Sequence, residues 1–274
     1  MAALDKNRLV IAFGEIRSGN RHSLLPFITA GYPDLATTDA LLHDFERRGV
    51  RICELGIPFS DPIADGPVIQ ASYTEALAAG VTSEKVFEMV RRYRGAGGAL
   101  ALSAMVSYSI VYRHGVEAYL SEAAAAGFDA TIVPDLPLEE TPEYEKLAAA
   151  HGLCNVMLIA PTTDPDRRLA IARHSRGFIY YVSVAGITGE RDRLPEDTID
   201  AVAELRKHTD TPICVGFGIS RPETVAEVCK VADGAIVGSA IVHRIADAHK
   251  AGTPQDKLVK QIGDFVQELL EPVT

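Results

Sequence analysis

Short apolar runs recur along the chain, and amphipathic stretches separate them. Most runs are continuous rather than alternating, which is typical of parallel strands covered on both faces. We predict eight such strands: Leu24–Thr29, Arg51–Gly56, Ala99–Met105, Ala130–Pro134, Asn155–Ala160, Phe178–Ser183, Pro212–Gly218 and Gly234–Gly238.

Apolar residues at helical spacing fill the gaps between these strands. The predicted helices are Thr37–Arg48, Glu84–Arg94, Val116–Ala126, Glu143–His151, Pro165–Ser175, Glu196–Thr209, Pro222–Val231 and Ile241–Lys250. Eight strand–helix units predict a closed (β/α)8 TIM barrel formed by residues 1–274 as a single domain. An extra N-terminal helix near Lys6–Ser18 is expected to cover the barrel bottom, and Gln255–Leu270 to pack outside. An open doubly wound sheet is the alternative, but no Gly-x-Gly-x-x-Gly turn follows the first strand.

The second predicted strand carries a carboxylate in an otherwise apolar run. Side chains alternate across a strand, so Glu54 points into the barrel interior if Leu55 packs against the helices. A single acidic residue in a strand is more often an edge or ion-pair residue. Here a Pro/Gly-rich loop follows at once and adds Asp61 and Asp65, which favours a catalytic site.

Composition narrows the function classes. The chain has 274 residues, 47% of them hydrophobic, and a formal charge of −10, which argues against nucleic acid or an anionic membrane as a partner. No apolar run reaches the length of a membrane span, and no signal-peptide core is present. The four cysteines lack metal-type or redox-type spacing, so we expect core residues in a reducing cytoplasm.

Glycine-rich turns end the seventh and eighth predicted strands, in Gly216-Phe-Gly-Ile-Ser220 and Gly238-Ser-Ala240. Each turn precedes a helix, and helix N-termini offer free N–H groups and a partial positive charge. One such turn alone is most simply a tight turn. Two at adjacent strand ends predict a phosphate site, to which Gly186-Ile-Thr-Gly189 could add a further N–H and a lid.

Missing residues exclude other chemistry. No lysine falls at a predicted strand end, so a Schiff-base or pyridoxal phosphate enzyme is not expected. The histidines do not converge, and no metal site is predicted. Carboxylates and a tyrosine remain at the top face: Glu54, Asp61, Asp65, Asp135 and Tyr180. This set suits general acid–base catalysis without a cofactor.

The chain resembles the alpha subunit family of tryptophan synthase over nearly its whole length. The matching segments are Leu25–Pro33, Glu54–Pro67, Pro134–Glu140, Tyr180 with Gly186–Gly189, Gly216–Ser220 and Gly238–Ala240. The resemblance implies a lyase that cleaves indole-3-glycerol phosphate to indole and glyceraldehyde 3-phosphate by a retro-aldol reaction. It also implies a tryptophan synthase beta subunit as the partner, in an alpha2beta2 assembly.

The resemblance assigns roles by position. Glu54 would move protons at the indole C3 and the glycerol hydroxyl, and Asp65 would accept the indole N–H. Phe27 would pack against indole, and Tyr180 would line the site. Phosphate would bind to N–H groups of Gly189, Gly218, Gly238 and Ser239. Asp61 would contact the beta subunit.

Two positions depart from the family pattern. Ser107 and Ser109 stand in a strand-3 end that lacks the usual Asn-Pro, and Val184 stands where many members have arginine. The altered strand-3 end and the interface-like Asp61 loop leave open a barrel that mainly activates a beta partner. A stand-alone indole-releasing lyase and a sugar-phosphate isomerase of the same architecture also remain open.

Overall fold

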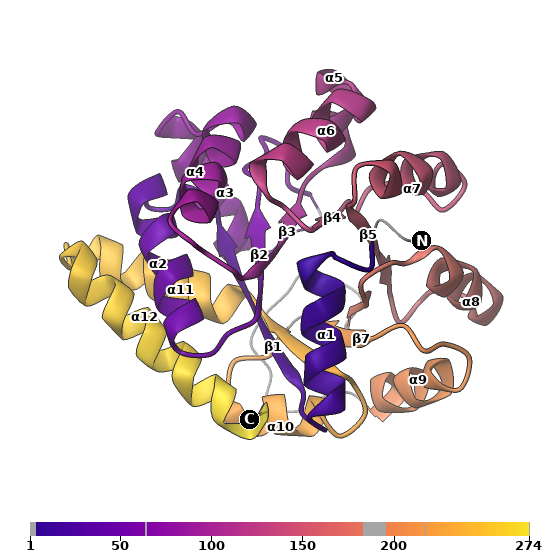
Figure 1. Ribbon diagram of the computed structural model, residues 1–274. Helices are drawn as coiled ribbons and strands as arrows, with labels where there is room; N and C mark the ends of the chain where they lie inside the picture. Colours follow the sequence, from indigo (N-terminus) through magenta and orange to yellow (C-terminus); the bar gives the residue numbers. More distant parts are fainter. Residues whose placement is uncertain (1–3, 64, 183–195, 217, 274) are drawn as a thin grey trace.

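A computed structural model describes residues 4–63, 65–182, 196–216 and 218–273. Eight parallel strands close into one barrel in sequence order (Figure 1). Their bounds are β1 Ser23–Thr29, β2 Ile52–Gly56, β3 Ala101–Met105, β4 Ala130–Ile132, β5 Cys154–Ile159, β6 Ile179–Val182, β7 Ile213–Gly216 and β8 Gly234–Val237. The prediction of a (β/α)8 barrel with an N-terminal helix is confirmed, and each predicted strand exists with ends that differ by one or two residues.

A ring of helices covers the barrel wall (Figure 1). It consists of α2 Leu35–Arg47, α4 Ser83–Gly95, α6 Val116–Ala126, α7 Thr141–Ala150, α8 Pro165–His174, α9 Glu196–Arg206, α10 Pro222–Val228 and α12 Gln255–Leu270. The last helix corrects our prediction. Because α12 packs against α2, α10 and β1, it is the eighth helix of the ring rather than an outer addition.

Three further helices lie between ring helices in the chain: α3 Pro67–Ala78, α5 Tyr108–His114 and α11 Ser239–Lys250. We predicted α11 as the eighth ring helix. In the structure α11 instead packs against α3 and β1. A short extra helix that begins directly after the eighth strand is a common way for this fold to build a phosphate site.

The N-terminal helix α1, Arg8–Ser18, closes one end of the barrel, and Figure 1 shows it lying across that end. Its apolar stripe of Leu9, Ala12, Phe13 and Ile16 is buried against residues of the barrel interior. Arg8 and Arg17 tie its two ends to Asp129 and Asp233, at 3.2 and 2.9 Å. These aspartates precede β4 and β8, and Glu15 of α1 also pairs with Arg51, which precedes β2. Helix and sheet are therefore joined at three places by ion pairs among the described residues.

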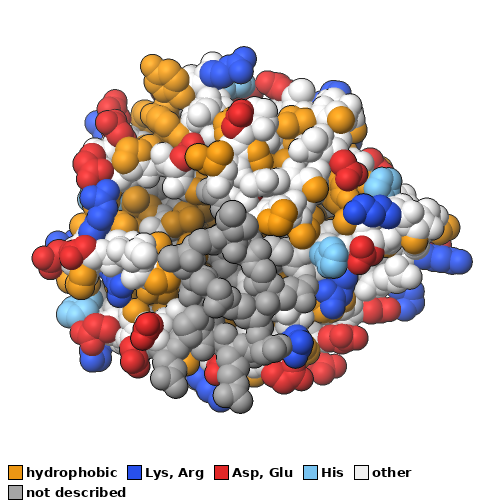
Figure 2. All heavy atoms as spheres, turned by 180° about the vertical axis from the view of Figure 1, so that it is seen from behind, with side chains coloured by type: hydrophobic (Ala, Val, Ile, Leu, Met, Phe, Trp, Pro, Cys, Tyr) orange, Lys and Arg blue, Asp and Glu red, His pale blue; other side chains and the backbone are white. Residues whose placement is uncertain are grey.

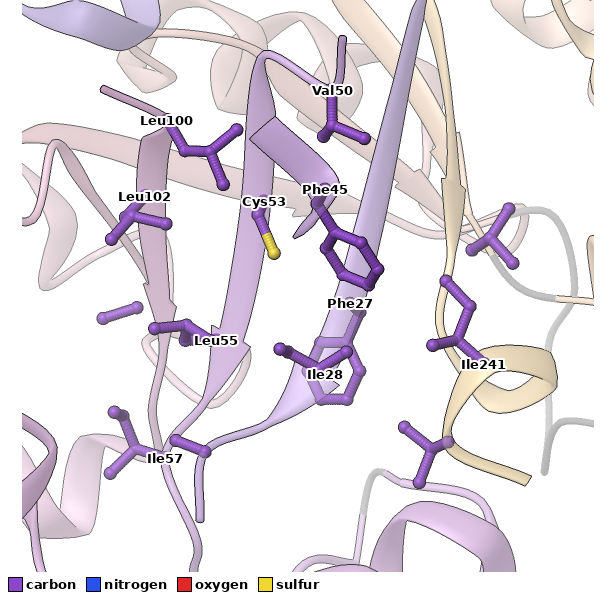
Figure 3. Packing of buried hydrophobic residues seen from close by; sticks show 14 of the residues in the cluster. Phe27, Ile28, Phe45, Val50, Cys53, Leu55, Ile57, Leu100, Leu102 and Ile241 are labelled. Carbon is purple, nitrogen blue, oxygen red and sulfur yellow. The ribbon is translucent and has the colours of Figure 1, made fainter. Parts of the chain in front are cut away.

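Alternation along the strands divides the core into two layers. Ile52 of β2 belongs to the barrel interior, while Cys53 and Leu55 belong to the layer between strands and helices. Figure 3 shows Cys53 and Leu55 in that outer layer, with Phe45 of α2 nearby. All four cysteines are buried and unbridged, which confirms that they are core residues. None of the helices in the described ranges has the length and apolarity that a membrane span requires.

Candidate active site

Glu54 lies on the interior face of the barrel, as the alternation of β2 predicts. Its side chain is fully buried, and the strand register places it between Phe27 of β1 and Ser103 of β3. Within the described part of the chain, neither carboxyl oxygen of Glu54 has a hydrogen-bond partner. A carboxyl group held in this way is neutral unless a reaction partner or a neighbouring donor stabilises its charge.

Burial raises the pKa of Glu54 well above its ordinary value, and desolvation is the cause. The shift has the sign that a general acid needs at neutral pH, because the group keeps its proton until a substrate accepts it. Glu54 in turn contributes to the raised pKa of Tyr180 on β6, after desolvation. The carboxyl therefore lies close enough to the phenol inside the barrel to affect its pKa.

Asp65 lies in the loop between β2 and α3, and the amide side chain of Gln70 holds this loop. The Gln70 Nε2 donates to the carbonyl oxygens of Asp65 and Pro62, at 2.8 and 3.2 Å. We expected a polar loop in which Asp65 stays ionised. Burial instead raises the pKa of Asp65 to about 6. The carboxylate is therefore mostly ionised at pH 7 and loses its charge as the pH falls through about 6.

Glycines at two strand ends make room for the aromatic residues of the site. A Cβ on Gly56 would lie 2.5 Å from the Phe27 ring and 2.6 Å from the Tyr73 hydroxyl. A Cβ on Gly216 would lie 2.6 Å from the Tyr180 hydroxyl. Only glycine allows such an approach. The structure thus brings Phe27 and Tyr180 to the same interior region as Glu54.

Sequence reasoning missed two residues of this region. Tyr73 of α3 is buried, lines a pocket together with Asp65, and has a pKa raised by desolvation and then by Asp65 and Glu54. A signal existed, since Ile69, Ser72, Tyr73 and Ala76 form a buried helical stripe after Gly66-Pro67. Ser103, beside Glu54, carried no signal beyond its place on an interior face.

The predicted phosphate residues lie at the ends of β7 and β8. Gly218 has a φ of +82°, a conformation that favours glycine. Gly238 is the N-cap of α11 and Ser239 is its first residue, so the free N–H groups of this helix begin there. A Cβ on Gly238 would lie 3.3 Å from Phe27, which places the helix start beside the site. Gly189 and Val184 lie outside the described residues.

The loop that carries Asp61 borders the same pocket as Asp65 and Tyr73. Asp61 is exposed, accepts a hydrogen bond from Ser60 at 2.5 Å, and stands near Ile63, which is 91% exposed. Phe59, Pro62 and Ile63 line this pocket together, and neighbouring apolar residues at a rim suit a surface that a partner covers. Figure 2 views the molecule from the side opposite to α1 and shows hydrophobic side chains interspersed with acidic ones.

Asp135, the remaining acidic candidate, lines the same pocket and forms hydrogen bonds with the start of α5. Its carboxylate accepts hydrogen bonds from the Ser107 hydroxyl and the Tyr108 N–H, at 2.8 and 2.7 Å. Ser107 is also the N-cap of α5. The altered strand-3 end therefore forms a capped helix that is tied to the loop after β4. Among the described residues, no group of three or more His, Cys, Asp or Glu side chains is arranged to hold a metal ion.

Comparison with known proteins is consistent along the whole chain. The sequence profile of the family Tryptophan synthase alpha chain matches residues 13–270. The tryptophan synthase alpha chain of Rhodopirellula baltica is 45% identical over 268 residues, covering 95% of this chain and 96% of that protein. The one from Geobacter sulfurreducens is 42% identical and covers 97% and 99%.

Solved structures agree with these relatives. The tryptophan synthase subunit alpha of Legionella pneumophila superposes with a TM-score of 0.88 at 32% identity, covering 97% of this chain and 98% of that one. A chain of Mycobacterium tuberculosis tryptophan synthase in its aminoacrylate-bound form gives 0.83 at 30% identity, with 98% and 100% covered. With a profile match over most of its length and relatives above 40% identity, the chain belongs to the tryptophan synthase alpha chain family.

Proposed function

We propose that this chain cleaves indole-3-glycerol phosphate to indole and glyceraldehyde 3-phosphate, with Glu54 as the general acid and base. The observation that carries the assignment of roles is the fully buried carboxyl of Glu54, whose pKa is raised by burial. The second carboxylate, Asp65, acts on the same two tyrosines, Tyr73 and Tyr180. Family membership supports the reaction itself.

The proposed chemistry needs no electron sink from the protein. Glu54 gives its proton to C3 of the indole ring, and the resulting cation carries a C=N⁺ bond. The carbon–carbon bond then breaks, its electrons return to the ring, and the carbinol hydroxyl becomes an aldehyde by giving its proton to the Glu54 carboxylate. The proton count closes, because Glu54 ends as it began.

Asp65 supplies the opposite charge. An ionised carboxylate beside the ring nitrogen accepts the indole N–H and stabilises the cation formed at C3 protonation. With a pKa of about 6, Asp65 carries this charge at neutral pH. Phe27 and Tyr180 would enclose the ring. The two carboxyl groups thus have different protonation states because they lie in different surroundings.

Binding of the phosphate would use backbone rather than side-chain charge. Gly238 and Ser239 would offer N–H groups at the start of α11, where the helix dipole favours an anion, and Gly218 would add one from the loop after β7. Gly189 keeps its predicted role there. This arrangement anchors one end of the substrate and leaves the indole end to face Glu54.

Replacement of Glu54 tests the proposal. In Glu54→Gln the amide keeps the shape but cannot transfer the proton, so cleavage of indole-3-glycerol phosphate should fall at least about 100-fold while substrate still binds. Indole release by the purified chain, with and without added beta subunit, is the measurement. Near-normal cleavage by this variant would contradict the assignment. Glu88→Gln, on the exposed face of α4, is the matched control and should cleave normally.

The tryptophan synthase beta subunit is the expected partner. The exposed Asp61 loop with Ile63 supports a docking surface at the open end of the barrel. The same observation favours the second candidate function, a barrel that chiefly activates the beta subunit. Rapid cleavage by the isolated chain would exclude that candidate. We also propose a cytoplasmic location, in keeping with four unbridged thiols.

A further inference from the structure

Two buried polar groups without partners lie side by side in the barrel wall. The Ser103 hydroxyl and both carboxyl oxygens of Glu54 are shielded from water, and none has a hydrogen-bond partner among the described residues. The register pairs these two residues directly across β2 and β3. Side chains at paired positions of adjacent strands point to the same face, so both groups face the barrel interior. Unpaired buried polar groups are rare and costly, so two neighbours of this kind require an explanation.

A serine hydroxyl rotates about a single bond and both donates and accepts hydrogen bonds. A protonated Glu54 is neutral and gains little from a hydrogen bond donated by this hydroxyl. An ionised Glu54, formed once the proton has left for the substrate, is an acceptor without a partner in a dry site. We propose that Ser103 is a positioning residue that donates a hydrogen bond to the Glu54 carboxylate during the reaction. This inference rests on the proposed function, because it concerns the ionised form of the same acid.

Glu54 has one paired neighbour on each adjacent strand. Phe27, on the β1 side, is apolar, so Ser103 is the paired neighbour that carries a hydrogen-bond donor. Among the titratable groups around Glu54 are Cys53 on its own strand, Cys214 on β7, Tyr180 on β6, Tyr73 on α3 and Asp65 in the loop after β2. Burial raises the pKa of each of these groups, so the thiols and phenols keep their protons at pH 7 and place no negative charge beside Glu54. Asp65 acts on the same two tyrosines as Glu54, namely Tyr73 and Tyr180.

Removal of the hydroxyl gives a signed prediction. A hydrogen bond to the charged form lowers a carboxyl pKa, so Ser103→Ala should raise the pKa of Glu54 further. Cleavage requires the protonated acid at the start, so the fall of kcat/KM at high pH should move to higher pH in this variant. The ionised acid loses its donor, so kcat should fall about tenfold with little change in KM. Ser103→Thr keeps the hydroxyl and should restore both the pH profile and kcat.

A control separates this role from general damage to the core. Tyr181 carries another buried hydroxyl without a partner among the described residues, but it lies in the outer layer of the barrel wall. Tyr181→Phe should leave the pH profile unchanged. An equal shift of the high-pH limb in Ser103→Ala and Tyr181→Phe would overturn the proposal.

A second measurement needs no turnover. Titration of the Glu54 carboxyl carbon by NMR, assigned by its loss in Glu54→Gln, should give a higher pKa in Ser103→Ala than in the wild type or Ser103→Thr. An unchanged pKa would overturn the role of Ser103, even if Glu54→Gln had already confirmed the proposed function. If Glu54→Gln cleaves normally, the proposed function fails first and independently.

Discussion

The two ends of the barrel differ in how their carboxylates are partnered by hydrogen bonds and ion pairs. At the end closed by α1, Asp129 accepts the Leu102 N–H at 2.9 Å and pairs with Arg8 and Arg94. Asp233 repeats this arrangement, since it accepts the Ile213 N–H at 2.7 Å and pairs with arginines of α1 and α9. At the open end, Glu54 has no such partner among the described residues.

This difference separates structural from chemical use of the same functional group. For Asp233, burial raises the pKa, but the hydrogen bonds from Arg17, Ile213 and Arg206 outweigh it and the net pKa is lowered. For Asp129, burial outweighs the arginines, and its pKa stays above the ordinary value. A carboxylate with fixed donors holds elements together. One without them, such as Glu54, is free to exchange a proton.

The largest effect should come from the closed end. Asp129→Ala leaves Arg94 largely buried without its carboxylate and removes an acceptor of the Leu102 N–H, so the free energy of unfolding should fall by about 3–5 kcal/mol. Denaturant unfolding measures it. Glu88→Ala, which breaks the exposed pair with Arg92, should cost less than about 1 kcal/mol. Equal losses in both variants would remove the contrast between the pairs.

The open end should respond with the opposite sign. The folded pKa of Glu54 is raised, so the wild type loses stability as pH rises from the unfolded pKa toward the folded one. Glutamine does not titrate, so Glu54→Gln lacks this pH dependence. The unfolding free energy of the variant minus that of the wild type should therefore grow by about 1.4 kcal/mol per pH unit across that window. Unfolding curves of both chains at several pH values test this. A constant difference between them would contradict a buried, neutral Glu54.

Asp65 should set the low-pH limit of activity. Because its pKa is about 6 and the ionised form is needed, kcat/KM should fall about tenfold per pH unit below that value. Tyr73 lines the same pocket as Asp65. We predict that its O–H stabilises the ionised carboxylate, so this limit should move upward in Tyr73→Phe. The pH profiles of both chains are the measurement. A limit that does not move would show that the Tyr73 hydroxyl does not stabilise Asp65.

The smallest effect concerns the exposed rim of the open end. Ser107→Ala removes the N-cap of α5 and one hydrogen bond to Asp135, which should cost about 1 kcal/mol of unfolding free energy. The free energy of unfolding of the two chains measures it, with Ser109→Ala as the control on the same helix. A loss as large as that of Asp129→Ala would show that the rim is as tightly coupled to the fold as the closed end.

Much of this organisation could be predicted from the pattern of apolar residues. Continuous runs located all eight strands, and alternation along β2 placed Glu54 inside the barrel. The pattern missed α3 and α5, because short helices at loop positions are specified by caps such as Gly66-Pro67 and Ser107. It also assigned the eighth ring position to α11 instead of α12. Amphipathicity tells which face of a helix is buried, but not which neighbour covers it.

The polar part of the site was less predictable. Glu54 and Asp65 stand out because carboxylates are unusual next to buried strands. Tyr73 and Ser103 do not, because tyrosine and serine occur throughout cores and surfaces. Their significance comes from neighbours on other elements, Asp65 for Tyr73 and Glu54 for Ser103. Such proximity depends on register and loop geometry, which a periodic pattern does not contain.

The ion pair between Arg17 and Asp233 also has a consequence for synthesis on the ribosome. Arg17 is among the first residues made, yet Asp233 stands 216 positions later. At the usual speed of about 5–20 residues per second, this arginine waits roughly 10–40 s for its carboxylate. The nascent helix therefore lacks the ion pair with Asp233 until nearly the whole polypeptide has been translated. The attachment of α1 to the closed end of the barrel is completed among the last steps of folding.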